Sequence, residues 1–158
     1  MPFEGEDEFS WFLRLLPLGL ALGFGALLLL RASPPPPPAN SLVFGCYANP
    51  HAAAILLNAT GMHIRQGGFP AIAFHLQRHK TGISLVAEAP IRADRTAQGY
   101  QFAIDRRGIG RFLDFYREQD GRVYGVFDEG LLEGFQMLAT DGARLNYQPA
   151  DVGRCVAD

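Results

Sequence analysis

An uncharged run near the N-terminus, broken only by Arg14, constrains the fold of this chain most strongly. It covers residues 9–30, and at about 1.5 Å per residue a helix of this length spans about 33 Å, the thickness of a bilayer's hydrocarbon core. Arg14 can extend its guanidinium to the near interface, where Trp11 provides an aromatic anchor. We therefore expect a single transmembrane helix over residues 9–31, preceded by an acidic tail, residues 1–8.

Two other interpretations of this run are weaker. A cleaved signal peptide normally starts with basic residues, whereas this chain starts with acidic ones, and the segment near Ala32 is a poor cleavage site. A buried soluble helix would have a polar face, which the run lacks. The spacing of Gly19 and Gly23 is typical of helix–helix contacts in lipid. The expected partners of the helix are therefore membrane lipid and, through these glycines, a second copy.

A proline-rich linker follows, over residues 32–40. Its five consecutive prolines, Pro34 to Pro38, favour a polyproline II segment about 15 Å long. Such a segment acts as a spacer, and the alternative is a docking ligand for a proline-binding module. The remainder, residues 41–158, is long enough for one modest core.

The charge of this C-terminal part argues against nucleic acid as a partner. Residues 41–158 contain 12 Lys and Arg against 12 Asp and Glu, whereas a nucleic-acid surface needs an excess of cations. The cations predominate in residues 41–111 and the acids in residues 112–158. The halves form a dipolar surface if they lie apart, and they neutralise each other if their strands interleave.

The two cysteines, Cys46 and Cys155, lie near the two ends of the expected domain. Two thiols without further ligands at suitable spacing make a poor zinc site, so we expect a disulfide, with two buried free thiols as the alternative. A disulfide requires an oxidising compartment, which places the domain outside the cytoplasm. The charge rule does not decide the orientation, because Arg14 and Arg31 flank the apolar run one on each side. With 13 Arg to one Lys, typical of a high-GC bacterial genome, we expect a single-pass protein of the bacterial inner membrane with its C-terminal domain in the periplasm.

Short apolar runs separated by turn residues dominate the domain and indicate strands. Glycine-containing turns at residues 58–61, 79–82, 119–121 and 140–142 favour antiparallel hairpins. The fold class that we expect is mainly β, a small antiparallel β-barrel or sandwich with one short helix. The strands are expected over residues 42–48, 54–57, 62–65, 71–76, 83–87, 100–104, 122–127, 135–139 and 143–147.

Three segments also fit a helix. Asn49 and Pro50 are good residues for the cap and first turn of a helix over residues 49–54. Residues 111–118 place aromatic side chains at helical spacing, and residues 131–138 fit the same period weakly.

No motif in the sequence indicates catalysis, a cofactor or a metal. His75 and His79 would be about 13 Å apart in a strand, too far for one ion. The carboxylates around Asp128, Glu129 and Glu133 have no fixed separation, and no serine sits in a nucleophile motif. We expect no catalytic, cofactor or metal residues.

Aromatic residues crowd the second half of the domain. They either pack in the core or line a face that binds a ligand or a partner. The expected function is a membrane-anchored, non-enzymatic periplasmic domain that acts through protein contacts, as an accessory or assembly subunit of an envelope complex. The alternative is a β-barrel that binds a small apolar ligand, and a hydrolase is a third interpretation. The candidate face consists of Phe112, Phe115, Tyr116, Tyr124, Phe127 and Phe135.

Overall fold

The computed structural model describes residues 35–105 and 112–156. The predicted acidic tail, the predicted membrane anchor and the start of the proline linker lie outside the described residues. Within the described ranges, neither the α-helix nor the two 3-10 turns are long and apolar enough to cross a bilayer. Residues 37–158 form one compact unit.

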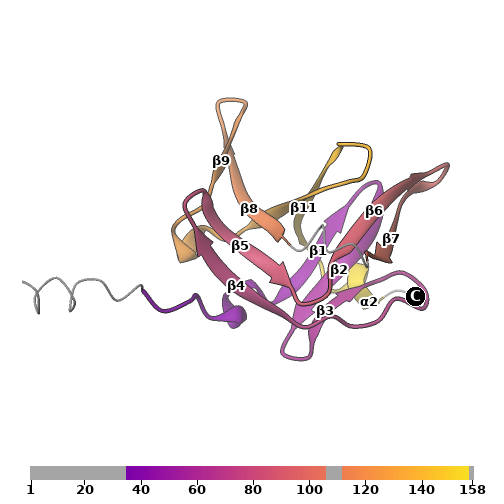
Figure 1. The fold of residues 1–158 in the computed structure, drawn as a ribbon, viewed down its shortest axis with the longest axis horizontal. Coiled ribbons are helices and arrows are strands. Elements are labelled where there is room, and N and C mark those ends of the chain that lie inside the picture. Colours follow the sequence, from indigo (N-terminus) through magenta and orange to yellow (C-terminus); the bar gives the residue numbers. More distant parts are fainter. Residues whose placement is uncertain (1–34, 106–111, 157–158) are drawn as a thin grey trace, which may run out of the picture. The chain divides into compact units, whose positions relative to one another are not determined.

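The unit is mainly β (Figure 1), as the sequence predicts. It begins with a 3-10 turn, η1 (Asn40–Val43), and ends with one short helix, α2 (Gly153–Val156). A second 3-10 turn, η2 (Glu129–Leu131), lies late in the chain. The strands are β1 (Gly45–Asn49), β2 (Ala52–Asn58), β3 (Gly61–Ile64), β4 (Phe74–His79), β5 (Gly82–Ala87), β6 (Ile91–Thr96), β7 (Gly99–Ile104), β8 (Phe112–Gln119), β9 (Arg122–Gly125), β10 (Gly134–Leu138) and β11 (Arg144–Ala150).

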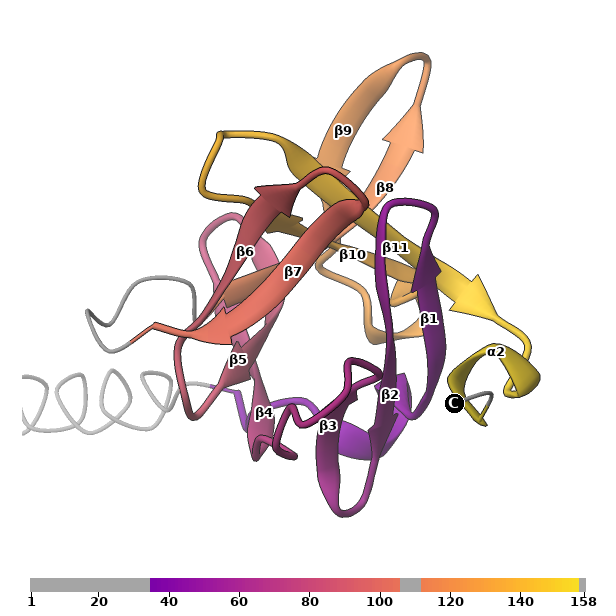
Figure 2. The ribbon, with the colours of Figure 1, turned by 90° about the vertical axis from the view of Figure 1, so that its right-hand side faces the viewer.

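All of the strands belong to one open, mixed sheet. Its main path runs β4-β5-β8-β10-β11-β1-β2-β7-β6, with β3 paired to β2 and β9 paired to β8. Figure 2 shows how this sheet curls round, so that β6 and β7 lie across from β1 and β2. Every pairing is antiparallel except that of β2 with β7, which is parallel and consists of the single pair Ala52↔Tyr100. Of the two expected architectures, barrel and sandwich, the closed barrel is wrong, because the sheet is open and mixed.

The sheet stays open because its end strands are covered by side chains and turns instead of pairing with each other. The carboxamide of Asn40 donates to the carbonyl oxygen of Phe74 (3.0 Å) and accepts from the amide of Leu76 (3.0 Å), so it occupies the outer edge of β4. At the other end of the sheet, the amide of Thr140 donates to the carbonyl oxygen of Ala93 in β6 (3.0 Å). Polar groups at both edges are thereby satisfied without closure.

The glycine turns determine where most hairpins form. Gly61 and Gly82 both have positive φ, and a Cβ on either would lie within 3 Å of a backbone oxygen of another segment. The strands predicted on either side of these turns are present, with ends shifted by up to three residues. The sequence pattern misses the strand β6 because its charged residues, Arg92, Asp94 and Arg95, obscure the alternation.

The helical interpretations of three segments are wrong. Asn49 accepts a hydrogen bond from the amide of His51 (2.9 Å) and so forms the turn between β1 and β2 rather than a helix cap. Residues 112–119 form β8, in which Leu113 and Phe115 face the core. The third segment contains η2 and β10. The one short helix, α2, lies elsewhere, at the C-terminus.

The concave side of the sheet is filled by an aromatic cluster. The ring of Phe135 stacks on Tyr147 with centroids 5.2 Å apart, and it contacts Tyr47 (4.9 Å) and Phe115 (5.8 Å). The two buried phenols donate to backbone oxygens, Tyr147 to Ala53 at 2.9 Å and Tyr47 to Val43 at 3.0 Å. Because a buried hydroxyl without a partner is costly, these bonds stabilise the cluster.

The predicted disulfide between Cys46 and Cys155 is present, with Cα atoms 5.8 Å apart. Cys46 follows the alternation of β1, so it points away from the core residue Tyr47. The helix α2 contacts β1 and β2 on that side and carries Cys155. Both sulfur-bearing side chains are buried, so the bridge fixes the C-terminus to the back of the sheet.

Candidate functional site

The β8–β9 hairpin extends beyond the rest of the sheet. The last pair between β8 and β10 is Tyr116↔Gly134, whereas β8 continues to pair with β9 as far as Gln119↔Arg122. Residues 117–124 therefore form a two-stranded ribbon without a second neighbour strand, and Figure 1 shows it projecting from the domain. All four residues of β9 are exposed. This ribbon is the most exposed regular element among the described residues.

Two local features build the ribbon. Asp120 and Gly121 both have positive φ, 53° and 70°, as a two-residue hairpin turn requires. At the base, Gly125 lies against the backbone of Thr81, and a Cβ at Gly125 would stand only 1.8 Å from the carbonyl oxygen of Thr81. The absence of a side chain at Gly125 thus allows β9 to lie in line with the start of β5, beside the same edge of β8.

Apolar side chains gather on the ribbon and on the loop after it. Val123, Tyr124, Phe127 and Leu131 are each between 42% and 59% exposed. They lie within nine residues of one another in the chain, whereas single exposed apolar residues elsewhere are ordinary. We call these four residues the apolar patch.

The two faces of the ribbon carry different charges. Residues directly opposite each other in an antiparallel pair share a face, and the register pairs Arg117 with Tyr124 and Gln119 with Arg122. These four residues form what we call the basic face. Glu118 and Val123 are opposite each other on the other face.

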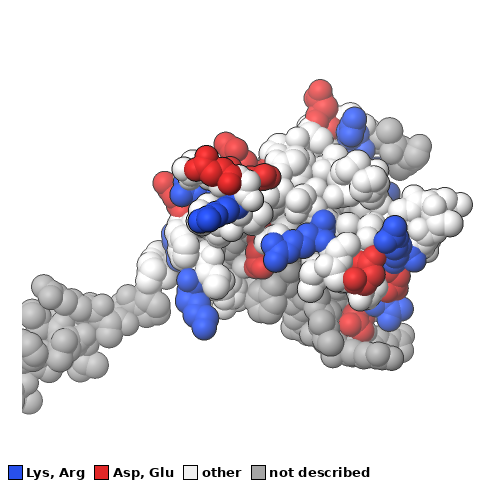
Figure 3. Space-filling view, turned by 90° about the horizontal axis from the view of Figure 1, so that it is seen from above, with Lys and Arg blue, Asp and Glu red and all other residues white. Residues whose placement is uncertain are grey.

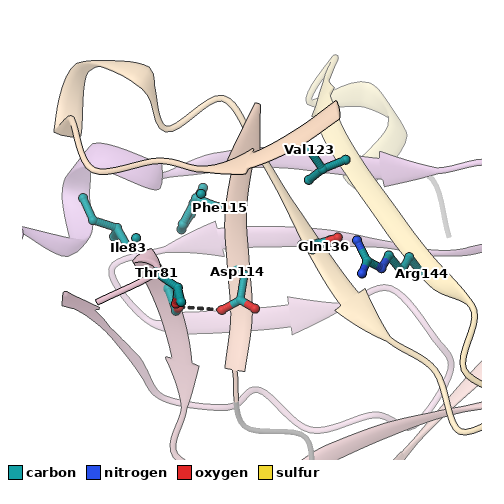
Figure 4. A pocket seen from close by; sticks show the side chains of 10 residues that line it. Thr81, Ile83, Asp114, Phe115, Val123, Gln136 and Arg144 are labelled. Atoms are coloured by element: carbon teal, nitrogen blue, oxygen red, sulfur yellow. Dashed lines mark hydrogen bonds between the residues drawn. The ribbon is translucent and has the colours of Figure 1, made fainter. Parts of the chain in front are cut away.

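A hollow of about 170 Å³ lies beneath this other face (Figure 4). Val123 lines it together with Asp114 of β8, Gln136 of β10 and Arg144 of β11. The hydroxyl of Ser84 donates to the carboxylate of Asp114 at 2.6 Å. Ser84 is buried and lies directly opposite Asp114 in the pairing of β5 with β8, so this contact is a cross-strand hydrogen bond.

A second, shallower hollow lies beside the turn between β6 and β7 and is lined by His51, Arg95 and Tyr100 among others. The phenol of Tyr100 donates to Asp141 (3.0 Å), and Arg95 lies 3.7 Å from the same carboxylate. The backbone amide of Ala143 holds the pKa of Asp141 below its ordinary value, with smaller contributions from Tyr100 and Arg95. The contacts of Tyr100 and Arg95 with Asp141 connect the tip of the β6–β7 hairpin to the β10–β11 turn.

The predicted aromatic face is divided by the structure. Phe115 and Phe135 lie in the core, and Tyr116 is buried on the opposite side, where its hydroxyl accepts from Gln148 (2.6 Å). Tyr124 and Phe127, three residues apart in the chain, are both exposed. The side chain of Phe112 lies outside what the structure describes. Among the five described members, therefore, only two are available to a partner.

The charged and histidine candidates form local pairs. His75 contacts Glu88 at 2.8 Å, and Arg78 pairs with Glu129. The pair of Arg78 with Glu129 joins the cation-rich half of the sequence to the acid-rich half, and Figure 3 shows cationic and acidic side chains interleaved on one side of the domain. Within residues 35–105 and 112–156, no three His, Cys, Asp or Glu side chains come together as metal ligands.

The ribbon was not identified as a site from the sequence. The turn Gln119-Asp120-Gly121 indicates a hairpin in the sequence. That this hairpin extends beyond the pairing of β8 with β10 appears only in the structure. No protein-family model matches the chain, and no curated protein and no solved structure is significantly similar to it.

Proposed function

We propose that this protein is a single-pass, membrane-anchored, non-enzymatic domain that acts through protein contacts in the bacterial periplasm. The observation that carries the proposal is the projecting ribbon with its apolar patch. An isolated two-stranded ribbon is marginally stable in water, because its faces have nothing to pack against. A partner that packs over Tyr124 or over Val123, which lie on opposite faces of the ribbon, would bury apolar surface and supply the missing layer on that face.

The compartment is supported by two observations. The apolar run of residues 9–30 has the length of a membrane span, and the Cys46–Cys155 disulfide requires an oxidising environment. In intact cells, a membrane-impermeant reagent should modify a cysteine introduced at the exposed position Gln101 without lysis. Modification only after lysis would contradict the periplasmic assignment.

The alternative function, a β-barrel that holds a small apolar ligand, has less support. The sheet is open, and its concave side is occupied by the rings of Phe135, Tyr147 and Phe115. An environment-sensitive apolar dye distinguishes the two functions. Saturable uptake without unfolding would favour the ligand-binding alternative over the contact function.

Site-specific photo-crosslinking in native membranes tests the contact function. A photoreactive residue at Phe127 should give a defined adduct with another protein, and the same residue at Gln101, an exposed position on β7, should not. Replacing Val123 and Tyr124 with serine in the Phe127 crosslinking variant should abolish the adduct. Recovery of the uncrosslinked monomer alone at both positions would refute the proposal.

A further inference from the structure

The basic face of the ribbon points to the chemistry of the partner, an inference that rests on the proposed contact function. The side chains of Arg117 and Arg122 lie on the same face, diagonally across the two strands, and Tyr124 is directly opposite Arg117 and two residues along β9 from Arg122. Diagonal neighbours in such a ladder are about 7–8 Å apart, within reach of long side chains. Glu118, next to Arg117, points to the other face, and Asp120, two residues before Arg122, lies in the hairpin turn.

No carboxylate in residues 35–105 and 112–156 neutralises either guanidinium. Ion pairs join Arg78 to Glu129 and Arg92 to Asp94, but within the part of the chain that the structure describes neither Arg117 nor Arg122 pairs with a carboxylate. Two like charges held close together on an exposed ribbon are unfavourable for stability. An anionic group placed between them would remove this repulsion.

Because both cations of the basic face are arginines, the chemical class of the anion can be narrowed. Arginine presents a planar fork that binds a carboxylate through two parallel hydrogen bonds, and the exposed ring of Tyr124 on the same face offers an apolar surface. A nucleic acid would need a broad cationic field, whereas residues 41–158 have as many acids as cations. A protein carboxylate fits two isolated guanidiniums better than a polyphosphate chain does.

We propose that the basic face, Arg117, Gln119, Arg122 and Tyr124, binds an acidic segment of the protein partner, one that alternates Asp or Glu with apolar side chains. The carboxylates of the segment pair with the two guanidiniums, and its apolar side chains cover Tyr124, the residue of the apolar patch that lies on this face. Salt weakens the complex, because the pairs form at an exposed surface.

Binding of synthetic peptides to the full-length protein in detergent tests the proposal. The probes are a labelled peptide of alternating glutamate and leucine, its counterpart of alternating glutamine and leucine, and labelled oligothymidylate. The glutamate peptide should bind saturably and more weakly as salt rises. The double variant Arg117→Gln/Arg122→Gln should lose about tenfold or more in affinity, since each charged contact is worth more than a neutral one. Arg154→Gln, which removes an exposed arginine from α2, should bind as the parent does.

Three results would overturn this proposal. They are absence of saturable binding by the glutamate peptide, equal binding of the glutamine peptide, and tighter binding of oligothymidylate that depends on the same arginines. The photo-crosslink at Phe127 is an independent readout. An adduct there together with failure of the acidic peptide would refute only the partner chemistry, whereas loss of the adduct would refute the contact function itself.

Discussion

The side-chain carboxamide of Gln66 makes two hydrogen bonds with the main chain of Phe102. Its Nε2 donates to the carbonyl oxygen at 2.8 Å and its Oε1 accepts from the amide at 2.7 Å. The strand β7 has only one backbone pair with β2, Ala52↔Tyr100. Gln66 therefore takes the place of a neighbouring strand along the part of β7 that β2 does not reach.

Replacing Gln66 with alanine should destabilise the domain. Both main-chain groups of Phe102 would lose their partner, and a half-buried polar group without a partner costs roughly 1–3 kcal/mol. The free energy of unfolding, measured by urea denaturation, should fall by about that amount. Gln77→Ala, which removes an exposed glutamine from β4, is the matched control and should leave the midpoint unchanged. Equal midpoints for Gln66→Ala and the parent would show that water replaces the two hydrogen bonds of Gln66 without loss of stability.

Gly125→Ala should detach the base of the ribbon. The added methyl group would lie 1.8 Å from the carbonyl oxygen of Thr81, and because that atom is backbone, no side-chain rotation relieves the clash. Overpacking of this kind costs about 1–3 kcal/mol. Amide hydrogen exchange should speed up over residues 116–125 more than over β1 and β2. Gly67→Ala is the control, because a Cβ at this position has no atom within 4 Å. Its amide exchange rates should equal those of the parent.

The disulfide should contribute a large part of the stability. It closes a loop with a sequence separation of 109, for which the chain-entropy model gives about 4 kcal/mol or more, less any strain. The Cys46→Ala/Cys155→Ala variant should unfold at a clearly lower urea concentration than the parent. A reductant should lower the midpoint of the parent and leave that of the double variant unchanged. If the parent and the double variant unfolded at the same urea concentration, the bridge would have no structural role.

The sequence predicted the hairpins whose turns have their own chemistry. Glycines at positions 61, 82 and 142 adopt positive φ, and the apolar runs beside them pair as expected. The disulfide was also predictable, because only one pairing exists for Cys46 and Cys155. In these cases a local preference and the tertiary structure agree.

What the sequence could not predict depends on contacts between distant segments. Residues 112–119 have aromatic residues at helical spacing. They nevertheless form a strand, because Leu113 and Phe115 pack in the core when the segment pairs with β5 and β10. Whether the sheet closes depends on edge contacts such as that of Asn40 with β4, over 34 residues of separation. The projecting ribbon likewise results from β10 ending its pairing at Tyr116, which no local pattern shows.

Alkaline unfolding should be controlled by the two core tyrosines. Burial raises the pKa of Tyr47 to about 12, and it also raises the pKa of Tyr147. Below pH 10 both phenols are neutral in the folded and the unfolded chain, so they cause no change in stability. Above pH 10 the unfolded chain ionises first, so the free energy of unfolding should fall by up to about 1.4 kcal/mol per pH unit for each tyrosine, through about pH 12. Desolvation also raises the pKa of Tyr100 and of Tyr116, so these two phenols add to the decline in the parent and in every variant that keeps them.

The Tyr47→Phe/Tyr147→Phe variant separates these phenols from general alkaline effects. It loses the hydrogen bonds to Val43 and Ala53, so at pH 7 its free energy of unfolding should be lower by about 1 kcal/mol per bond. Between pH 10 and 12, however, its stability should decline less steeply than that of the parent, since the phenols of Tyr47 and Tyr147 no longer ionise. Tyr124→Phe, at an exposed position, should keep the parental slope. Parallel alkaline slopes for the double variant and the parent would place the responsible groups elsewhere.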